Sequence, residues 1–153
     1  MLSHAQVVHF PVALFLTAVL VELMSLFWQK SFFSKVSLLL LILGSVTAFW
    51  ALITGDTAAE AVRHIDGIEP LLSTHQNAGK LAAWYFLFLT VFKTGLMKLG
   101  KDLLPWRLIV SMGLIFGAVL IYRTGLFGGK LVYERGAGVK PVMEKYLNNN
   151  ENF

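Results

Sequence analysis

Four long apolar stretches alternate with shorter polar ones along the chain. They cover about residues 4–28, 36–54, 74–97 and 105–127. Each stretch is long enough to cross the hydrocarbon core of a bilayer as a helix. The pattern predicts a single all-α domain over residues 1–153: an integral membrane four-helix bundle with both termini on the same side.

The connections between these spans differ in length and charge. The two outer connections are short and basic, whereas the central one is longer and carries acidic residues. In the central connection, Thr57 and Glu60 have the spacing of a capping box and Gly67 can end a helix. We therefore expect a short interfacial helix between the second and third spans. After the fourth span, glycines at turn-like positions predict a re-entrant or capping segment over residues 128–147.

Composition supports a place in lipid and excludes several kinds of site. The chain is 56% hydrophobic and 14% charged, with a mean hydropathy of +0.66, which does not suit a soluble globule. The absence of cysteine excludes thiolate metal sites, iron–sulfur clusters and covalently attached c-type haem. No basic tract suits nucleic acid. No set of nucleophile, base and orienting residue appears, which favours a carrier or a subunit over a stand-alone enzyme.

Two features inside the apolar spans need a structural explanation. Glu22 falls near the far end of the first span, where we expect it to snorkel or to pair with a basic residue, and a proton-relay role stays open. Gly113 and Gly117 form a G-x-x-x-G, which permits close helix packing within the bundle or against a partner subunit.

The distribution of charge predicts the orientation in the membrane. The short connections carry Lys30, Lys35, Lys93, Lys98, Lys101 and Arg107. The total number of basic residues does not distinguish the two sides, but the short connections have the higher density and only Asp102 as an acid. The positive-inside rule then places them in the cytoplasm and both termini outside.

Four sequence features resemble the bacterial membrane-protein family catalogued as domain of unknown function 2231. They are H-F-P-V-A-L at His9–Leu14, I-T-G at Ile53–Gly55, the isolated His75 before the third span, and G-G-K-L-V-Y-E-R-G-A-G-V at Gly128–Val139. The last motif is the most specific. Related domains occur beside cytochrome-like or Rieske-like modules, so the resemblance implies a b-type haem or a respiratory association. With the charge pattern, it implies a multi-pass protein of the bacterial inner (cytoplasmic) membrane with periplasmic termini.

Histidines at the end of an apolar span are the clearest candidates for chemistry. The predicted topology brings His4, His9, His64 and His75 to one end of the protein. We expect His9 and His75 to be axial ligands of one non-covalent haem held between the first and third helices. Residues five apart on a straight helix point about 140° away from each other. His4 and His9 should therefore not share one ligand, unless a kink at Pro11 redirects His4.

Other residues at this end are weaker candidates. His4 and His64 could form a second pair, or two or more of the histidines could bind copper or zinc. Arg123 and Arg135 could pair with haem propionates, and Tyr133 with Arg135 could contact a propionate or a quinone. A surface pair explains Tyr133 and Arg135 equally well.

These observations lead to two hypotheses about function. The first is a small b-type cytochrome-like membrane electron-transfer protein, or the haem-bearing membrane subunit of a respiratory or redox complex. Its partners would be the lipid bilayer and either other membrane redox subunits or a periplasmic electron carrier. The second is a cofactor-free structural subunit of a larger assembly. In that case His9 and His75 are interfacial polar residues hydrogen-bonded to the backbone or to one another.

Overall fold

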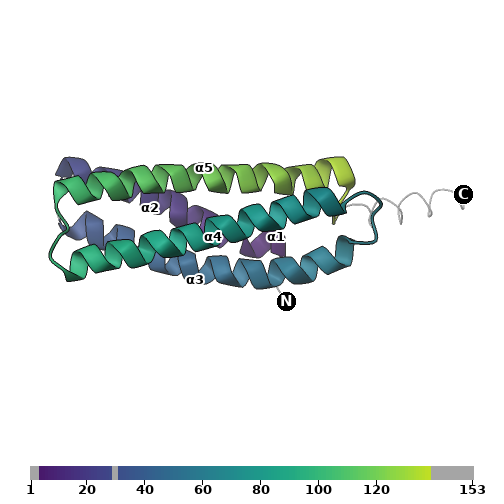
Figure 1. The fold of residues 1–153 in the computed structure, drawn as a ribbon, viewed down its shortest axis with the longest axis horizontal. Helices are drawn as coiled ribbons and strands as arrows, with labels where there is room; N and C mark the ends of the chain where they lie inside the picture. The colour runs from purple at the N-terminus through teal and green to yellow at the C-terminus, as the bar shows by residue number, and fades with distance from the viewer. Residues whose placement is uncertain (1–3, 29–30, 139–153) are drawn as a thin grey trace, which may run out of the picture.

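The computed structural model describes residues 4–28 and 31–138, and these form long helices without a strand. The elements are α1 (His4–Val7), α2 (His9–Trp28), α3 (Ser31–Val62), α4 (Glu69–Lys98) and α5 (Leu104–Arg135). Because α1 and α2 follow one another as a single interrupted helix, the chain is a four-helix bundle (Figure 1). The prediction of an all-α bundle is confirmed.

Three helical segments within residues 4–28 and 31–138 are long and apolar enough to cross a membrane. They are 4–28, 31–62 and 104–135. The remaining long helix, α4, is of similar length but carries Lys80 and Lys93 among its apolar residues.

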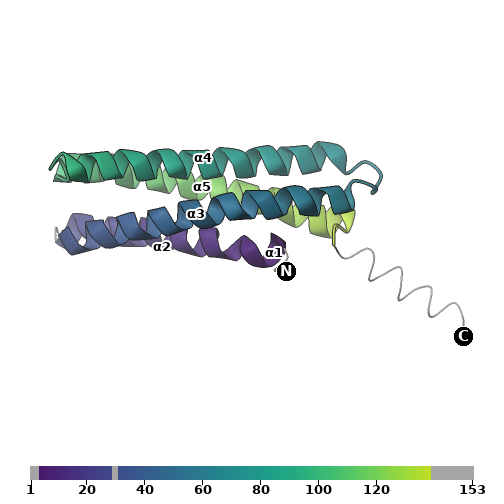
Figure 2. The same cartoon turned by 90° about the horizontal axis from the view of Figure 1, so that it is seen from below.

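Each long helix packs against two neighbours, in the cyclic order α2, α3, α4 and α5. Figures 1 and 2 show the four arms side by side along one axis. We call the end with Trp28, Ser31, Lys98 and Leu104 the short-turn end, and the opposite end, where α3 ends and α4 begins, the histidine end. The first arm stops before the histidine end is reached, so only α3, α4 and α5 continue to it (Figure 2).

The first helix is interrupted at Val8, as Pro11 predicts. Proline has no N–H and cannot donate to the carbonyl of Val7. The next backbone bond, from Val12 to the carbonyl of Val8, is long at 3.4 Å. The interruption leaves His4 on the inner face of α1, half-buried, and His9 exposed at the start of α2.

Two predicted elements differ from the structure. The interfacial helix expected near Thr57 is wrong, because α3 runs unbroken to Val62. The Thr57 hydroxyl donates back to the carbonyl of Ile53 (3.5 Å) instead of capping a new helix. The capping segment expected from Gly128 begins as helix, since α5 continues to Arg135 and ends at Gly136, whose φ of 66° is left-handed. The rest of that predicted segment, residues 139–147, lies outside the described residues.

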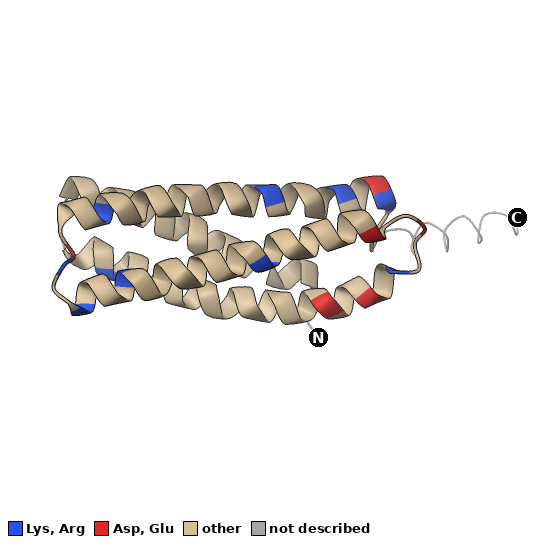
Figure 3. Cartoon of the chain, viewed as in Figure 1, with Lys and Arg blue, Asp and Glu red and all other residues tan. Residues whose placement is uncertain are grey.

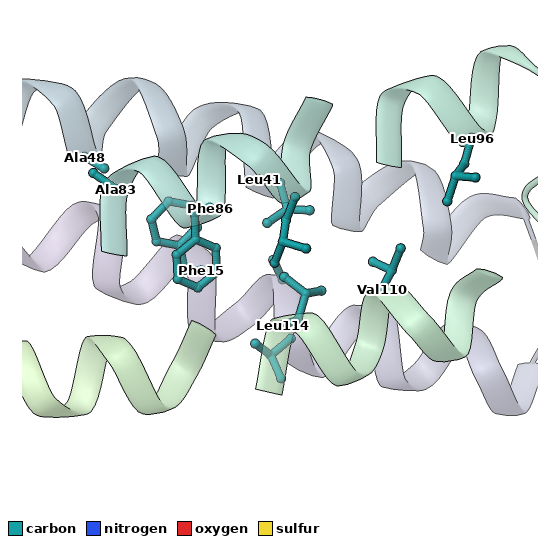
Figure 4. Close-up of a cluster of buried hydrophobic side chains, with 11 residues drawn as sticks. Phe15, Leu41, Ala48, Ala83, Phe86, Leu96, Val110 and Leu114 are labelled. Carbon is teal, nitrogen blue, oxygen red and sulfur yellow. The ribbon is translucent and has the colours of Figure 1, made fainter. Parts of the chain in front are cut away.

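The main core is built around two stacked phenylalanine rings on the bundle axis. Phe15 of α2 and Phe86 of α4 have ring centroids 3.8 Å apart and planes 11° apart (Figure 4). Glycines behind them make room: a Cβ on Gly44 would lie 2.5 Å from Phe15 Cε1, and one on Gly117 would lie 2.6 Å from Phe86 Cζ. Gly113 faces Leu89 in the same way, at 3.0 Å. The G-x-x-x-G therefore packs inside the bundle.

A second, smaller core closes the histidine end. Its buried members are Ala59, Ile65, Ile68, Leu72 and Leu131. They come from α3, the α3–α4 connection, α4 and α5. This core holds together the three helices that continue past the start of α1.

We predict that Gly117→Ala destabilises the bundle, because the added methyl group would overlap the Phe86 ring. Overpacking of this kind costs about 1–3 kcal/mol, which exceeds the roughly 0.5–1 kcal/mol that alanine gains over glycine in a helix. The control is Gly125→Ala on the same helix, where a Cβ meets no atom within 4 Å. Unfolding in detergent should show a loss for the first variant and none for the second; equal effects would contradict the ring-on-glycine packing.

Candidate functional site

Two helical hairpins, one made of α1, α2 and α3 and the other of α4 and α5, carry matching residues. Three residues of the first arm each have a counterpart 71 positions later in the chain. The pairs are His4 with His75, Phe15 with Phe86, and Glu22 with Lys93. Their spacing of 11 and then 7 residues makes five full turns, so all three side chains lie on one face of their helix.

Two of these pairs meet directly across the bundle axis. The two phenylalanine rings stack, and the Lys93 ammonium donates to Glu22 Oε2 at 2.5 Å. His4 and His75 lie close enough for their charges to interact. The two hairpins are therefore related by an approximate two-fold axis along the bundle, with the histidines at one end, the rings in the middle and the ion pair beyond them.

The second helix of each hairpin supplies a glycine to the histidine pair. A Cβ on Gly55 of α3 would lie 3.0 Å from His4 Cε1, and one on Gly128 of α5 would lie 3.1 Å from His75 Cε1. Each imidazole thus packs directly on the backbone of the neighbouring helix. Gly55 and Gly128 stand 11 residues beyond Gly44 and Gly117, which support the phenylalanine rings in the same manner.

Hydrogen bonds fix which nitrogen of each ring carries the proton. His75 Nδ1 lies 3.1 Å from the carbonyl oxygen of Thr124, which can only accept, so Nδ1 donates. His4 Nδ1 lies 3.2 Å from Thr54 Oγ1. That hydroxyl already donates to the carbonyl of Ala51 (3.1 Å), so it accepts from His4. In the neutral form of both rings, Nε2 therefore keeps its lone pair for a ligand.

The structure places His4, and not His9, on the inner side of the first arm, near enough to His75 for an electrostatic interaction. His9 is exposed on the outer surface of α2, as expected from the angle between residues five apart. His64 is exposed in the connection that follows α3. Among the described residues no group of three or more histidine and acidic side chains could hold a metal ion.

The other predicted site residues do not cover the histidine pair. Tyr133 is 90% exposed, and Arg135 is exposed with its guanidinium beside Gly67. Arg123 is exposed and lines a hollow between α4 and α5.

A buried charge network at the short-turn end was only partly foreseen. Glu22 is fully buried and Lys93 is 1% exposed, so the predicted pairing of Glu22 with a basic residue is confirmed. Lys93 Nζ also donates to Ser34 Oγ (3.0 Å), and Ser34 Oγ donates to Asp102 Oδ1 (3.0 Å). The expectation that Lys93 belongs to a short basic connection is wrong, because it lies inside α4 and is buried. Its place 71 residues after Glu22 is the feature that could have revealed the pair.

Arg107 closes this network on the α5 side. Its Nη2 and Nε atoms donate to the two carboxylate oxygens of Asp102 at 2.9 and 3.1 Å, and its Nη1 donates to the carbonyl of Ser25 at 3.3 Å. Two acids and two bases thus balance, and the network joins all four arms. Arg107 is buried, so it does not belong with the exposed basic residues that orient the protein.

The two oxygens of the Glu22 carboxylate differ in their hydrogen bonding, since only Oε2 accepts one from a described residue. Neither Glu22 Oε1 nor Ser111 Oγ has a hydrogen-bond partner within the described part of the chain. The Glu22 carboxylate is therefore compensated mainly by Lys93.

Comparison with known proteins yields one family. A sequence profile of the family described as "Predicted membrane protein (DUF2231)" matches residues 3–141. No curated protein and no solved structure matches the chain.

We predict that Lys93→Met lowers the free energy of unfolding by about 3–5 kcal/mol, because it leaves the buried Glu22 carboxylate without its counter-charge. The double variant Glu22→Gln with Lys93→Met should recover much of that loss. Lys98→Met is the control, since Lys98 is exposed on the same helix and should change stability by no more than about 0.5 kcal/mol. Unfolding in detergent gives these values, and similar effects at positions 93 and 98 would contradict the role of the ion pair.

We also predict that the short-turn end loses stability in acid through Asp102. Burial raises the pKa of Asp102, but hydrogen bonds from Arg107 and Ser34 and the charges of Arg107 and Lys93 outweigh burial and hold the pKa below its ordinary value of 3.8. A lowered pKa in the folded state means that the stabilisation is complete above pH 3.8 and disappears as the pH falls through the lower folded value. Unfolding curves against pH should show this loss in the wild type and a smaller one in Asp102→Asn. An unchanged pH profile in the variant would show that Asp102 does not contribute.

Proposed function

The chain belongs to this family of predicted membrane proteins, and from that premise we propose that it is a membrane electron-transfer protein in which His4 and His75 are the axial ligands of a b-type haem. The observation that carries the proposal is the paired imidazoles, each with Nδ1 donating to a fixed acceptor and Nε2 free to bind. This is the arrangement by which proteins orient histidine ligands. The partner of His75 in this proposal is His4, since His9 is exposed.

The donor set suits haem better than a free metal ion. Zinc sites use three or four protein ligands, whereas the macrocycle of haem supplies four of its own and leaves two positions for the protein. In the part of the chain that the structure describes, no third histidine or acidic side chain joins His4 and His75 in a group that could hold a metal ion. When bound through both axial positions, haem has no open coordination site and exchanges electrons without binding oxygen.

Residues of this chain hold the two rings in place. Thr54 and the carbonyl of Thr124 set the orientation of the imidazoles through their Nδ1 atoms. Gly55 and Gly128 let the rings lie against the helix backbones. Any larger residue at these two positions would displace a ligand, so the glycines act as positioning residues in the proposed site.

Charge distribution supports the proposed place in the membrane. The single deeply buried charge of α4, on Lys93, is neutralised by Glu22, so this helix can span together with the other three. The short-turn end exposes Lys35, Lys98 and Lys101, while acidic residues gather toward the histidine end (Figure 3). The density of basic residues in the short connections, and not their number, is the reason for which we place the short-turn end on the cytoplasmic side of a bacterial inner membrane. The histidine pair would then exchange electrons on the periplasmic side, with another membrane redox subunit or a periplasmic carrier.

We predict that the purified protein gives a b-type signal in a reduced-minus-oxidised absorbance spectrum. His4→Ala and His75→Ala should each lose most of this signal, because each removes one axial ligand. The matched controls are His9→Ala and His64→Ala, whose side chains are exposed, and both should keep it.

Two results would overturn this assignment. Loss of the signal in His9→Ala together with its retention in His4→Ala would reinstate the ligand set expected from the sequence. No signal from folded wild-type protein made in haem-replete cells would favour the cofactor-free structural subunit.

A further inference from the structure

A hollow of about 230 Å³ lies between α4 and α5 near the histidine end. Thr74, Asn77 and Leu81 line it from α4, and Leu120, Arg123 and Phe127 line it from α5. It stands beside the histidine pair: Thr74 precedes His75 in the chain, and Arg123 precedes Thr124, whose carbonyl accepts from His75. No residue of the proposed haem site lines it.

One wall of the hollow is positively charged and lacks counter-charges. Arg123 is exposed and forms no ion pair or hydrogen bond with other residues of 4–28 and 31–138. Lys80, on the same turns of α4 as the lining residues, is exposed as well. Asn77 has an amide that can donate, and none of the described residues that line the hollow is acidic. This wall therefore favours an anion.

The other wall is apolar and leads toward the middle of the bilayer. Leu81 and Leu120 form the inner end of the hollow, where the apolar part of each helix begins. Farther along the same two helices, Phe88 is 62% exposed and Phe116 is 54% exposed. The Phe116 ring contacts Tyr85 of α4, so aromatic side chains continue between the helices on this surface. A ligand that fits both walls has an anionic head and a long apolar chain.

We propose that this hollow binds an anionic phospholipid of the surrounding bilayer, with its phosphate against Arg123 and Asn77 and an acyl chain along Leu81 and Leu120. Basic pockets between membrane helices bind lipid head groups in this way, because a guanidinium pairs with phosphate oxygens through charge-assisted hydrogen bonds. The proposal does not depend on the haem assignment.

A quinone also has a long apolar chain that could lie along the apolar wall, but its ring fits the positively charged wall less well. Its ring is neutral, so it leaves the charge of Arg123 unpaired. Its oxidation or reduction also requires groups that exchange protons, and the lining residues within 4–28 and 31–138 include no carboxylate and no imidazole. An anionic phospholipid satisfies the guanidinium without any such chemistry.

Native mass spectrometry of the purified protein with added lipid tests the proposal. The wild type should retain phosphatidylglycerol in preference to phosphatidylcholine, and Arg123→Gln should weaken retention of phosphatidylglycerol about tenfold, the usual effect of losing one charge-assisted hydrogen bond. The matched control is Lys130→Gln, which removes an exposed basic residue from the same helix but not from the hollow, and it should bind like the wild type.

Other outcomes of the same experiment would overturn the proposal. Equal retention of the two lipids, or an Arg123→Gln variant that binds phosphatidylglycerol as the wild type does, would show that the hollow is not a site for an anionic head group. Displacement of bound phosphatidylglycerol by an added ubiquinone would assign the hollow to a quinone instead. Circular dichroism of each variant should match the wild type, and Arg123→Lys, which keeps the charge, should retain part of the preference if the site is as proposed.

Discussion

The ion pair between Glu22 and Lys93 is the interaction on which the alignment of the bundle depends. Both side chains are buried at a depth where the protein is surrounded by lipid, and a charge left unpaired there is very unfavourable. The pair connects α2 with α4, which stand on a diagonal of the bundle and meet through side chains rather than as neighbouring backbones. A slip of one turn in either helix would separate the two charges. The pair thereby sets the register in which Phe15 meets Phe86 and His4 approaches His75.

The approximate two-fold symmetry explains why a histidine pair exists at all. When two hairpins with the same residue spacing associate about one axis, an inward-facing residue of one meets its counterpart in the other. Identical residues suit this arrangement where they are phenylalanine or neutral histidine. At the position of the third pair, two glutamates or two lysines would repel each other. The chain instead has Glu22 on one hairpin and Lys93 on the other. This difference favours pairing between unlike hairpins over pairing of either hairpin with a copy of itself.

The sequence predicted the parts of this structure that depend on long patterns. Apolar length identified the helices, Pro11 marked the interruption of the first one, and the spacing of five residues predicted that His4 and His9 point in different directions. The sequence analysis assigned Lys93 and Arg107 to the short basic connections. A hydropathy average cannot distinguish a lysine that faces water from one that is paired inside the bundle. His9 as a ligand stays a prediction, and the proposed site uses His4 instead, whose inward direction is hard to read from the local sequence. Which face of α1 points inward depends on its packing against α3. The only sign of this in the sequence was that His4 stands 71 residues before His75, the same offset as in the other two pairs.

The order of the three pairs along the axis also determines from which side the histidines can be reached. Toward the short-turn end, the Phe15–Phe86 stack fills the axis between the helices and separates the histidines from the ion pair. His4 and Glu22 are 18 residues apart, roughly 27 Å along the helix, so the charges of the network lie far from the imidazoles. At the histidine end the first arm stops and only α3, α4 and α5 continue. A redox partner of the proposed site must therefore approach from this end, beside the three-helix extension, and not through the bundle.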